Sequence, residues 1–208
     1  MNDVIPINLA VEDPLSEIVV RVMLQQSGRH YAVGTCFGHY GFGYLKKRVN
    51  GFNNAAQGTP FLVLTDLDQT DCPPVLIREW FSSPIHNNLL FRIAVREVEA
   101  WLLAHRSAFA AFLGVREALV PDNPDELIDP KRSLIELTAK SRKRGIRDAI
   151  IPRAGSTARI GPDYNGQLIS YVQNNWKAKE AINHSTSLSK AFHAIRTFQP
   201  IFRLQGDE

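Results

Sequence analysis

The sequence predicts an α/β protein: a Rossmann-like parallel sheet of about four strands, flanked by helices and followed by a C-terminal helical extension. Short apolar runs of strand length recur along the first half, and segments with helical spacing separate them. Glycine and proline mark most of the joins. Alternating strands and helices build parallel sheets with right-handed crossovers, so the carboxyl ends of the strands should meet at one edge.

Four segments have the character of buried strands. Residues 4–12 (VIPINLAVE) are rich in Ile and Val and end in acidic residues. Residues 31–37 follow a glycine, residues 61–64 (FLVL) are wholly apolar, and residues 89–95 are the fourth run. Each run is too short for a typical helix, which favours the strand interpretation.

Helices are expected after each strand. The first opens at Pro14 and ends at Gly28, because proline suits the first helical turn and glycine stops a helix. A glycine-rich loop at 38–43 precedes the second. The third should run from Pro73 through Trp80, and the fourth from residue 96 to about 113.

The apolar spacing in the rest of the chain predicts a helical extension. We expect residues 1–115 to form the sheet domain and residues 116–208 to pack on it as helices. The helical runs lie near 130–144, 163–176 and 185–198.

Charge is unevenly distributed. The chain has 24 Lys and Arg against 21 Asp and Glu, a net of +3, which is too mild to establish nucleic-acid binding. The segment 131–159 holds nine basic residues against two acidic ones, a net of +7. This segment is either a solvated face or a surface for phosphates. Its candidate nucleic-acid contacts are Arg142, Lys143 and Arg144.

Two cysteines, Cys36 and Cys72, lack the paired spacing of a zinc site or the density of a disulfide scaffold. The N-terminus has no signal-peptide pattern, and no apolar run approaches the roughly 20 residues that span a bilayer. These features predict a cytoplasmic protein without a membrane segment. The histidines form no His-x-x-x-His pair and no Gly-x-Ser-x-Gly elbow is present, which disfavours a zinc enzyme or a serine hydrolase.

Acidic residues follow three of the predicted strands, which is the main functional signal. Glu12 follows the first, Asp66 and Asp68 the third, and Glu97 and Glu99 the fourth. Taken singly, each group could be a helix cap or a partner of a helix dipole. Together they predict a site for Mg²⁺ or Mn²⁺, which prefer oxygen ligands. Weaker candidate ligands are Glu17 and Asp71.

The glycine-rich loop offers a second, softer signal. Its glycines precede Lys46 and Lys47, so backbone N–H groups and an ammonium could approach a phosphate. The spacing matches neither a P-loop nor the dinucleotide fingerprint, and a flexible turn is the alternative interpretation.

Over about residues 4–113 the chain resembles the Toprim domain of topoisomerases, primases, small ribosomal-RNA maturases and overcoming-lysogenization-defect nucleases. The resemblance rests on Glu12 in the turn AVED and on Asp66-Leu67-Asp68 after an apolar strand. The string VREVEAWLLA at 95–104 is similar to that of short Toprim-like proteins of unassigned function, often encoded beside ABC-type ATPases in phage-defence loci.

The resemblance implies roles for single residues. Glu12 would be the general acid/base and touch metal, Asp66 and Asp68 would bind metal, and Glu99 would be a further ligand. The sequence departs from the family at two places. Asp13 stands where the family has glycine, with Glu17 five residues after Glu12 rather than four, and the glycine that usually follows Asp-x-Asp is missing.

These observations predict a Mg²⁺- or Mn²⁺-dependent nuclease for DNA or RNA, a toxin-like effector in antiviral defence controlled by a partner ATPase. One alternative is a non-catalytic module of the same fold that binds nucleic acid or protein. A primase- or topoisomerase-like nucleotidyl transferase is the other, and the chain is short for that activity.

Overall fold

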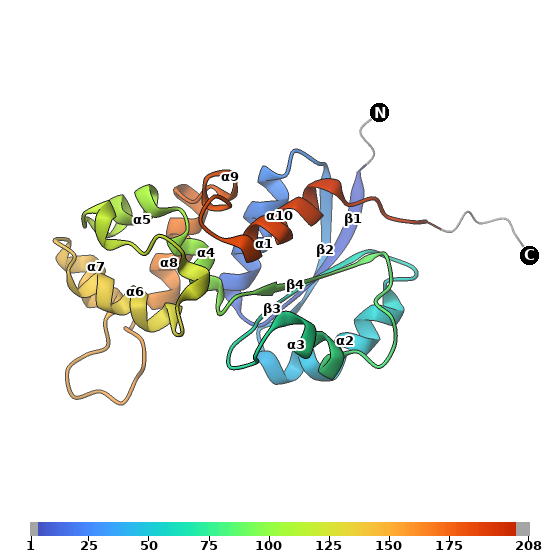
Figure 1. The fold of residues 1–208 in the computed structure, drawn as a ribbon, viewed down its shortest axis with the longest axis horizontal. Coiled ribbons are helices and arrows are strands. Elements are labelled where there is room, and N and C mark those ends of the chain that lie inside the picture. Colours follow the sequence, from blue (N-terminus) through green and yellow to red (C-terminus); the bar gives the residue numbers. More distant parts are fainter. Residues whose placement is uncertain (1–3, 203–208) are drawn as a thin grey trace, which may run out of the picture. The chain divides into compact units, whose positions relative to one another are not determined.

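The computed structural model describes residues 4–202 and confirms the predicted α/β class (Figure 1). Its four strands are parallel and lie in the order β2-β1-β3-β4. Their bounds are β1 Ile5–Val11, β2 Tyr31–Gly38, β3 Phe61–Asp66 and β4 Leu89–Ala94. From β1 the chain passes first to β2, on one side of β1 in the sheet, and then to β3, on the other side of β1. The carboxyl ends of β1 and β3 therefore form the topological switch point, where open α/β sheets bind ligands.

Helices cover both faces of the sheet. Helix α1 and the C-terminal half of α10 lie over one face, and α2 and α3 lie over the other (Figure 1). Their bounds are α1 Pro14–Gln26, α2 Phe42–Ala55, α3 Pro73–Trp80 and α10 Thr186–Thr197. The first residue of α1 is a proline, as predicted, and the Asp13 carboxylate caps the helix by accepting the N–H of Ser16.

The core between the sheet and α2 is aromatic. The ring of Phe37 on β2 lies 5.5 Å from that of Phe52 on α2 and 5.9 Å from that of Phe61 on β3, centroid to centroid. All four residues of the FLVL run are buried. This apolar packing fixes β3, and with it the acidic turn that follows, against β1.

Strand β2 carries one more residue than β1 across part of their pairing. Ile7 pairs with Val33, but Leu9 pairs with Cys36, so the alternation of faces shifts by one residue. Phe37 consequently faces α2, while Cys36 faces α1. The bulge thus decides which side chain of β2 meets the first turn of α1.

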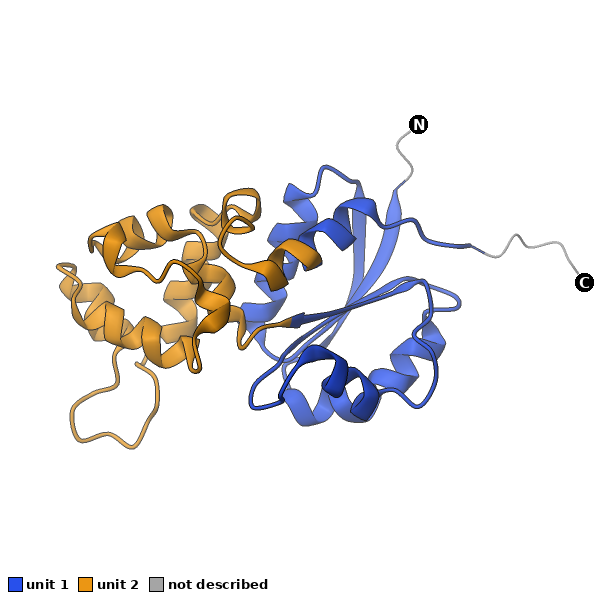
Figure 2. Ribbon diagram, in the orientation of Figure 1, with its two compact units in different colours: residues 1–93, 191–208 blue, residues 94–190 orange. Residues whose placement is uncertain are grey.

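The chain divides into two compact units (Figure 2). The first contains the sheet and comprises residues up to Ile93 together with those from Ala191 on. The second comprises residues Ala94 to Lys190 and is helical. Besides the start of α10, its helices are α4 Val98–Leu103, α5 Arg106–Leu113, α6 Pro130–Ala139, α7 Arg144–Ile150, α8 Tyr164–Asn174 and α9 Ala178–Ala181, with short 3₁₀ turns at Glu117–Leu119 and Pro124–Glu126.

Buried tryptophans hold the second unit together. The indole N–H of Trp176 donates to the backbone oxygen of Trp101 at 3.0 Å. The indole N–H of Trp101 donates in turn to the Ser187 hydroxyl at 2.7 Å. Both rings are almost fully buried, so helix α4 is a central element of this unit.

The structure differs from the sequence prediction at the domain boundary. The units divide after Ile93 rather than after residue 115, because α4 packs on α6 and α9 of the helical unit. The C-terminal residues also return to the sheet unit, where Asn88 makes two hydrogen bonds of 2.7 Å with the backbone of Ile201. The extension predicted for 116–208 is therefore shared between the units.

Two predicted helices are also shorter than expected. The helix predicted for 96–113 breaks at His105, whose Nδ1 accepts the backbone N–H of Lys177 at 3.1 Å. The run near 130–144 ends at Ala139, and a new helix begins at Arg144. Within residues 4–202, no helix combines the length and the apolarity that a membrane crossing requires.

Candidate metal centre at the carboxyl edge of the sheet

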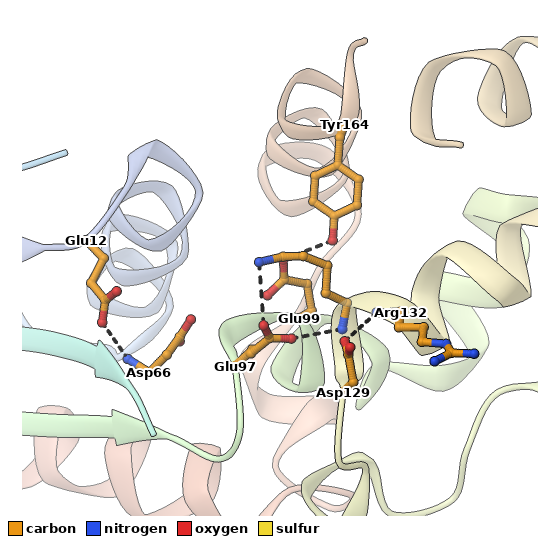
Figure 3. A network of polar contacts seen from close by, with 8 residues as sticks. Glu12, Asp66, Glu97, Glu99, Asp129, Arg132 and Tyr164 are labelled. Carbon is orange, nitrogen blue, oxygen red and sulfur yellow. Dashed lines mark hydrogen bonds and ion pairs between the residues drawn. The ribbon is translucent and has the colours of Figure 1, made fainter. Parts of the chain in front are cut away.

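The parallel register of β1 and β3 positions Glu12. Ala10 pairs with Val63, which places Glu12, two residues later, beside Thr65. The Thr65 hydroxyl donates to Glu12 Oε1 at 2.5 Å. The backbone N–H of Asp66 donates to the same oxygen at 2.9 Å (Figure 3). Both bonds use Oε1, so Oε2 is the oxygen oriented away from this pair of donors.

The electrostatic environment favours a proton or a cation on Glu12. Burial raises the pKa of this carboxyl, and the hydrogen bonds from Thr65 and Asp66 only partly oppose that effect. The negative charges of Asp68 and Asp13 raise the pKa further. A half-buried carboxylate among other acids is a base suited to proton transfer, and its surroundings attract positive charge.

Asp66 and Asp68 are both half-buried in the turn after β3. Asp68 has a positive φ of 49°, an uncommon backbone conformation for a residue other than glycine. Asp71 lies further along the turn and is exposed. The structure therefore brings Asp66 and Asp68 to the edge that bears Glu12 and leaves Asp71 on the surface.

Glu12, Asp66 and Asp68 all offer carboxylate oxygens, which are the ligands that a hard divalent cation such as Mg²⁺ prefers. They do not form a closed ligand set. Among residues 4–202, the three ligand atoms that all lie within 4.8 Å of one another belong to Glu17, Cys36 and His39. Carboxylates repel one another without a cation, so we expect binding to draw Glu12, Asp66 and Asp68 together.

Glu99 lies in the helical unit, in a different setting from the one its strand-end position predicted. Its buried side chain accepts the Tyr164 hydroxyl at 2.9 Å (Figure 3). It also lies 3.4 Å from the Lys131 ammonium. Glu97 accepts the backbone N–H of Lys131 at 3.0 Å. Burial raises the pKa of Glu99, Lys131 opposes this, and Glu97 adds to it. The role of Glu99 as a metal ligand stays a prediction.

Glu17, a weaker candidate ligand, belongs to another cluster. Its Oε1 binds the Arg21 guanidinium at 2.7 Å and its Oε2 lies 2.8 Å from His39 Nε2. Burial acts to raise the pKa of Glu17, but the bonds from Arg21, His39 and Cys36 outweigh it and lower the pKa. Burial, with Glu17 beside it, raises the pKa of the Cys36 thiol to about 11.

The predicted phosphate contacts Lys46 and Lys47 lie on α2, whose N-terminal end contacts the Glu12 backbone. Lys46 and Lys47, with Gly43 and Tyr44, line an open surface pocket in the first half of the helix. The N–H of Gly41, which precedes α2, donates to the backbone oxygen of Glu12 at 3.0 Å. The N-terminus of α2 therefore starts beside the metal candidate, with its positive dipole end at the carboxyl edge of the sheet.

Several side chains of the basic segment serve the fold. The Lys143 ammonium donates to the backbone oxygens of Ala111 and Phe112 near the end of α5, at 2.8 and 2.9 Å. Arg144 lies 3.5 Å from Asp148 on the same helix, and Arg142 is exposed. Contact with phosphate stays a prediction for all three basic residues, and for Lys143 it would replace two existing bonds.

Comparison with known proteins adds no relative, since no family model, curated protein or solved structure matches the chain significantly. The site thus rests on its own geometry. Sequence reasoning missed three residues: Thr65, Cys36 and His39. The position of Thr65 directly before Asp66 was a signal for the first, since the neighbouring strand of a parallel pair presents its residues to Glu12. The other two depend on the bulge in β2.

Proposed function

We propose that this protein is a phosphodiesterase that cleaves nucleic acid with Mg²⁺ or Mn²⁺ held by Glu12, Asp66 and Asp68. The observation that carries the proposal is the position of the Glu12 carboxylate, bonded to Thr65 and the Asp66 N–H at the carboxyl ends of β1 and β3. That edge is the switch point of the sheet. The resemblance of AVED and Asp66-Leu67-Asp68 to the Toprim motifs supports the same assignment.

The chain's own residues would divide the chemistry. A bound Mg²⁺ or Mn²⁺ would supply Lewis-acid polarisation of the phosphate and an acidified water. Asp66 and Asp68 would hold the cation through carboxylate oxygens. Glu12 would accept the proton of the attacking water, since burial raises its pKa and makes it a stronger base than an exposed glutamate.

Nucleic acid would be held by its phosphates. Lys46 and Lys47 are exposed on α2, whose N-terminus begins beside the Glu12 backbone. Arg142 and Arg144 are exposed basic residues of the helical unit. Contacts of this kind read the backbone rather than the bases, so the proposed enzyme would show little sequence preference.

We further propose that cleavage is controlled by an ABC-type ATPase in a cytoplasmic antiviral system. This part rests on the similarity of residues 95–104 to short Toprim-like proteins encoded beside such ATPases. The two free cysteines, Cys36 and Cys72, are compatible with a reducing compartment.

The test is cleavage of plasmid, single-stranded DNA and transfer RNA by the purified full chain with Mg²⁺ or Mn²⁺. We expect Glu12→Gln and Asp68→Asn each to reduce the rate by at least about 100-fold, the lower range for loss of a general base. Glu136→Gln is the matched control. It makes the same chemical change on an exposed glutamate of α6 and should leave the rate unchanged.

Two outcomes would overturn the proposal. Cleavage that persists in the Glu12→Gln, Asp68→Asn double variant would belong to a contaminant or to another site. Nucleic-acid binding without cleavage, and without any effect of Mn²⁺, would identify the chain as a non-catalytic binding module instead.

A further inference from the structure

We propose that Glu17, Cys36 and His39 form a second cation site in the sheet unit, one that takes Zn²⁺. One ligand atom from each residue lies within 4.8 Å of the others. This site does not depend on the phosphodiesterase proposal, because it shares no residue with Glu12, Asp66 and Asp68.

Helix α1, strand β2 and the bend directly after β2 deliver the three side chains. Glu17 lies in the first turn of α1. Cys36 faces that turn because the extra residue of β2 shifts the alternation of the strand. His39 follows β2 with a positive φ of 66°, and its backbone N–H donates to the oxygen of Val11 at 3.3 Å. The local backbone therefore holds all three groups on one side of β1 and β2.

The donor set selects the cation. A thiolate, an imidazole and a carboxylate together are typical ligands of Zn²⁺, whereas Mg²⁺ and Ca²⁺ favour oxygen alone. Zn²⁺ bond lengths place tetrahedral ligand atoms about 3.4–3.7 Å apart. In the structure Glu17 Oε2 and His39 Nε2 are 2.8 Å apart, and no two of the three ligand atoms are more than 4.8 Å apart. Side-chain shifts of about 1 Å would therefore bring the three atoms to the separations of a tetrahedral zinc site.

The position of Arg21 is compatible with a bound ion. The guanidinium binds Glu17 at Oε1, while His39 shares Oε2. A cation can replace the shared proton at Oε2 while Arg21 continues to orient the carboxylate from outside, as the outer hydrogen-bond partners of metal ligands commonly do.

Binding of Zn²⁺ would displace protons from its ligands. The S–H bond of Cys36 breaks, a sulfur–zinc bond forms, and the proton passes to solvent. The proton that His39 Nε2 shares with Glu17 Oε2 passes to solvent as well, and the ring ligates through Nε2 with its one proton on Nδ1. Three protein ligands leave a fourth tetrahedral position, and the His39 side chain is 42% exposed, so water or a solvent-borne ligand can reach it.

The experiment uses Co²⁺ in place of Zn²⁺ on the reduced full chain, because Co²⁺ bound to a thiolate gives a charge-transfer absorption in the near ultraviolet. We expect this absorption to saturate with one equivalent of Co²⁺ and to disappear when Zn²⁺ is added. Cys36→Ser should abolish it, whereas Cys72→Ser should keep it, since Cys72 precedes α3 outside the cluster. Glu17→Gln should weaken Co²⁺ binding by at least about tenfold.

Failure of this proposal is distinguishable from failure of the phosphodiesterase. Absence of the absorption in the native chain, or its persistence in Cys36→Ser, would overturn the zinc site and leave the phosphodiesterase proposal intact. The Asp68→Asn variant should keep the absorption even where nuclease activity is lost. A misfolded Cys36→Ser chain would show itself by loss of the native circular dichroism and of cooperative unfolding in urea, and Glu17→Gln then decides the question.

Discussion

At the scale of single residues, the hydroxyl of Thr65 tunes Glu12. The hydrogen bond from Thr65 lowers the pKa of Glu12, against the larger effect of burial. Thr65→Val keeps the shape of the side chain but removes that donor, so the pKa of Glu12 should rise further. A general base must be deprotonated, and we therefore expect the acidic limb of the pH–rate profile with Mn²⁺ to move to higher pH.

A buried threonine elsewhere supplies the control for this measurement. Thr138 is fully buried in α6, and its hydroxyl donates to the backbone oxygen of Leu134. Thr138→Val should leave the acidic limb in place. An unchanged limb in Thr65→Val, or an equal shift in both variants, would show that Glu12 does not act as the base.

Because of Glu99, the free energy of unfolding of the helical unit should depend on pH. Its folded-state pKa is raised above the ordinary value of 4.5, so the folded protein binds this proton more tightly than the unfolded chain does. The stabilising contribution is complete below that ordinary value and is lost as pH rises through the folded-state pKa. We expect the stability advantage of Glu99→Gln over the native chain to grow with pH, measured by urea unfolding with tryptophan fluorescence from Trp101 and Trp176.

Glu136→Gln, on the exposed side of α6, should keep the native pH dependence. Measuring Mn²⁺ binding to the same variants tests whether Glu99 is a metal ligand. If Glu99→Gln also weakens Mn²⁺ binding by at least about tenfold, the sequence prediction that Glu99 holds metal gains support. A native chain that gains stability relative to Glu99→Gln as pH rises would contradict the burial argument.

At the scale of elements, Gly38 ends β2 where the backbone of β1 approaches closely. Its φ is +142°, and an added Cβ would lie 1.9 Å from the backbone oxygen of Val11. We expect Gly38→Ala to destabilise the protein by more than the roughly 1–3 kcal/mol of a strained φ, because the clash is with backbone. Urea unfolding measures the difference.

Gly51 in α2 is the matched control, since an added Cβ meets nothing within 4 Å. Gly51→Ala should stabilise the helix by about 0.5–1 kcal/mol. Equal effects of the two substitutions would show that the close approach of β1 and β2 at Gly38 is absent in solution.

The regular elements were largely predictable from the sequence. Prolines and apolar runs predicted the helix from Pro73 to Trp80 and the strand beginning at Phe61 because these signals are local. At the break between α4 and α5, His105 accepts a hydrogen bond from Lys177, 72 residues away, and no local pattern records such a contact. At the bulge in β2, the side-chain oxygen of Asn8 on β1 accepts the N–H of Thr35, which is another contact between distant residues.

The same distinction applies to the candidate sites. Glu12, Asp66 and Asp68 follow strands, so strand order alone brings them to one edge. The Glu17 cluster was not predictable, because Cys36 and Cys72 show no paired spacing and the ligands come from α1, β2 and the bend after β2. Linear motifs detect sites built on one loop or helix, and they miss sites assembled by a shifted strand.

At the scale of the whole molecule, the two compact units divide after Ile93, at a different place from the boundary predicted after residue 115. The run of helical spacing after residue 96 reads as the last helix of a sheet domain. In the structure its residues, including Trp101, pack among the other helices of the second unit. Which apolar face meets which partner is a tertiary property, and a periodic pattern does not reveal it.

The salt dependence of nucleic-acid binding tests whether the lysines of α2 contact phosphates. Removing one lysine–phosphate interaction reduces the slope of log Kobs against log salt by about 1. On single-stranded DNA each contact contributes about 0.7, so we expect Lys46→Gln with Lys47→Gln to reduce the slope by about 1.4, measured by fluorescence anisotropy without catalytic metal. Lys179→Gln, exposed on α9, should leave it unchanged. An unaltered slope in the double variant would remove α2 from the binding surface.

Carboxylates from the ends of β1 and β3 are central to the proposed activity, because they are expected to share one divalent cation. Titration calorimetry with Mn²⁺ tests this most directly, on a chain carrying Cys36→Ser so that the thiol cluster does not contribute. We expect one bound Mn²⁺, with an affinity that falls by at least about tenfold when Glu12→Gln and Asp68→Asn are added. Equal affinity with and without those two substitutions, or no binding in either chain, would contradict the shared site.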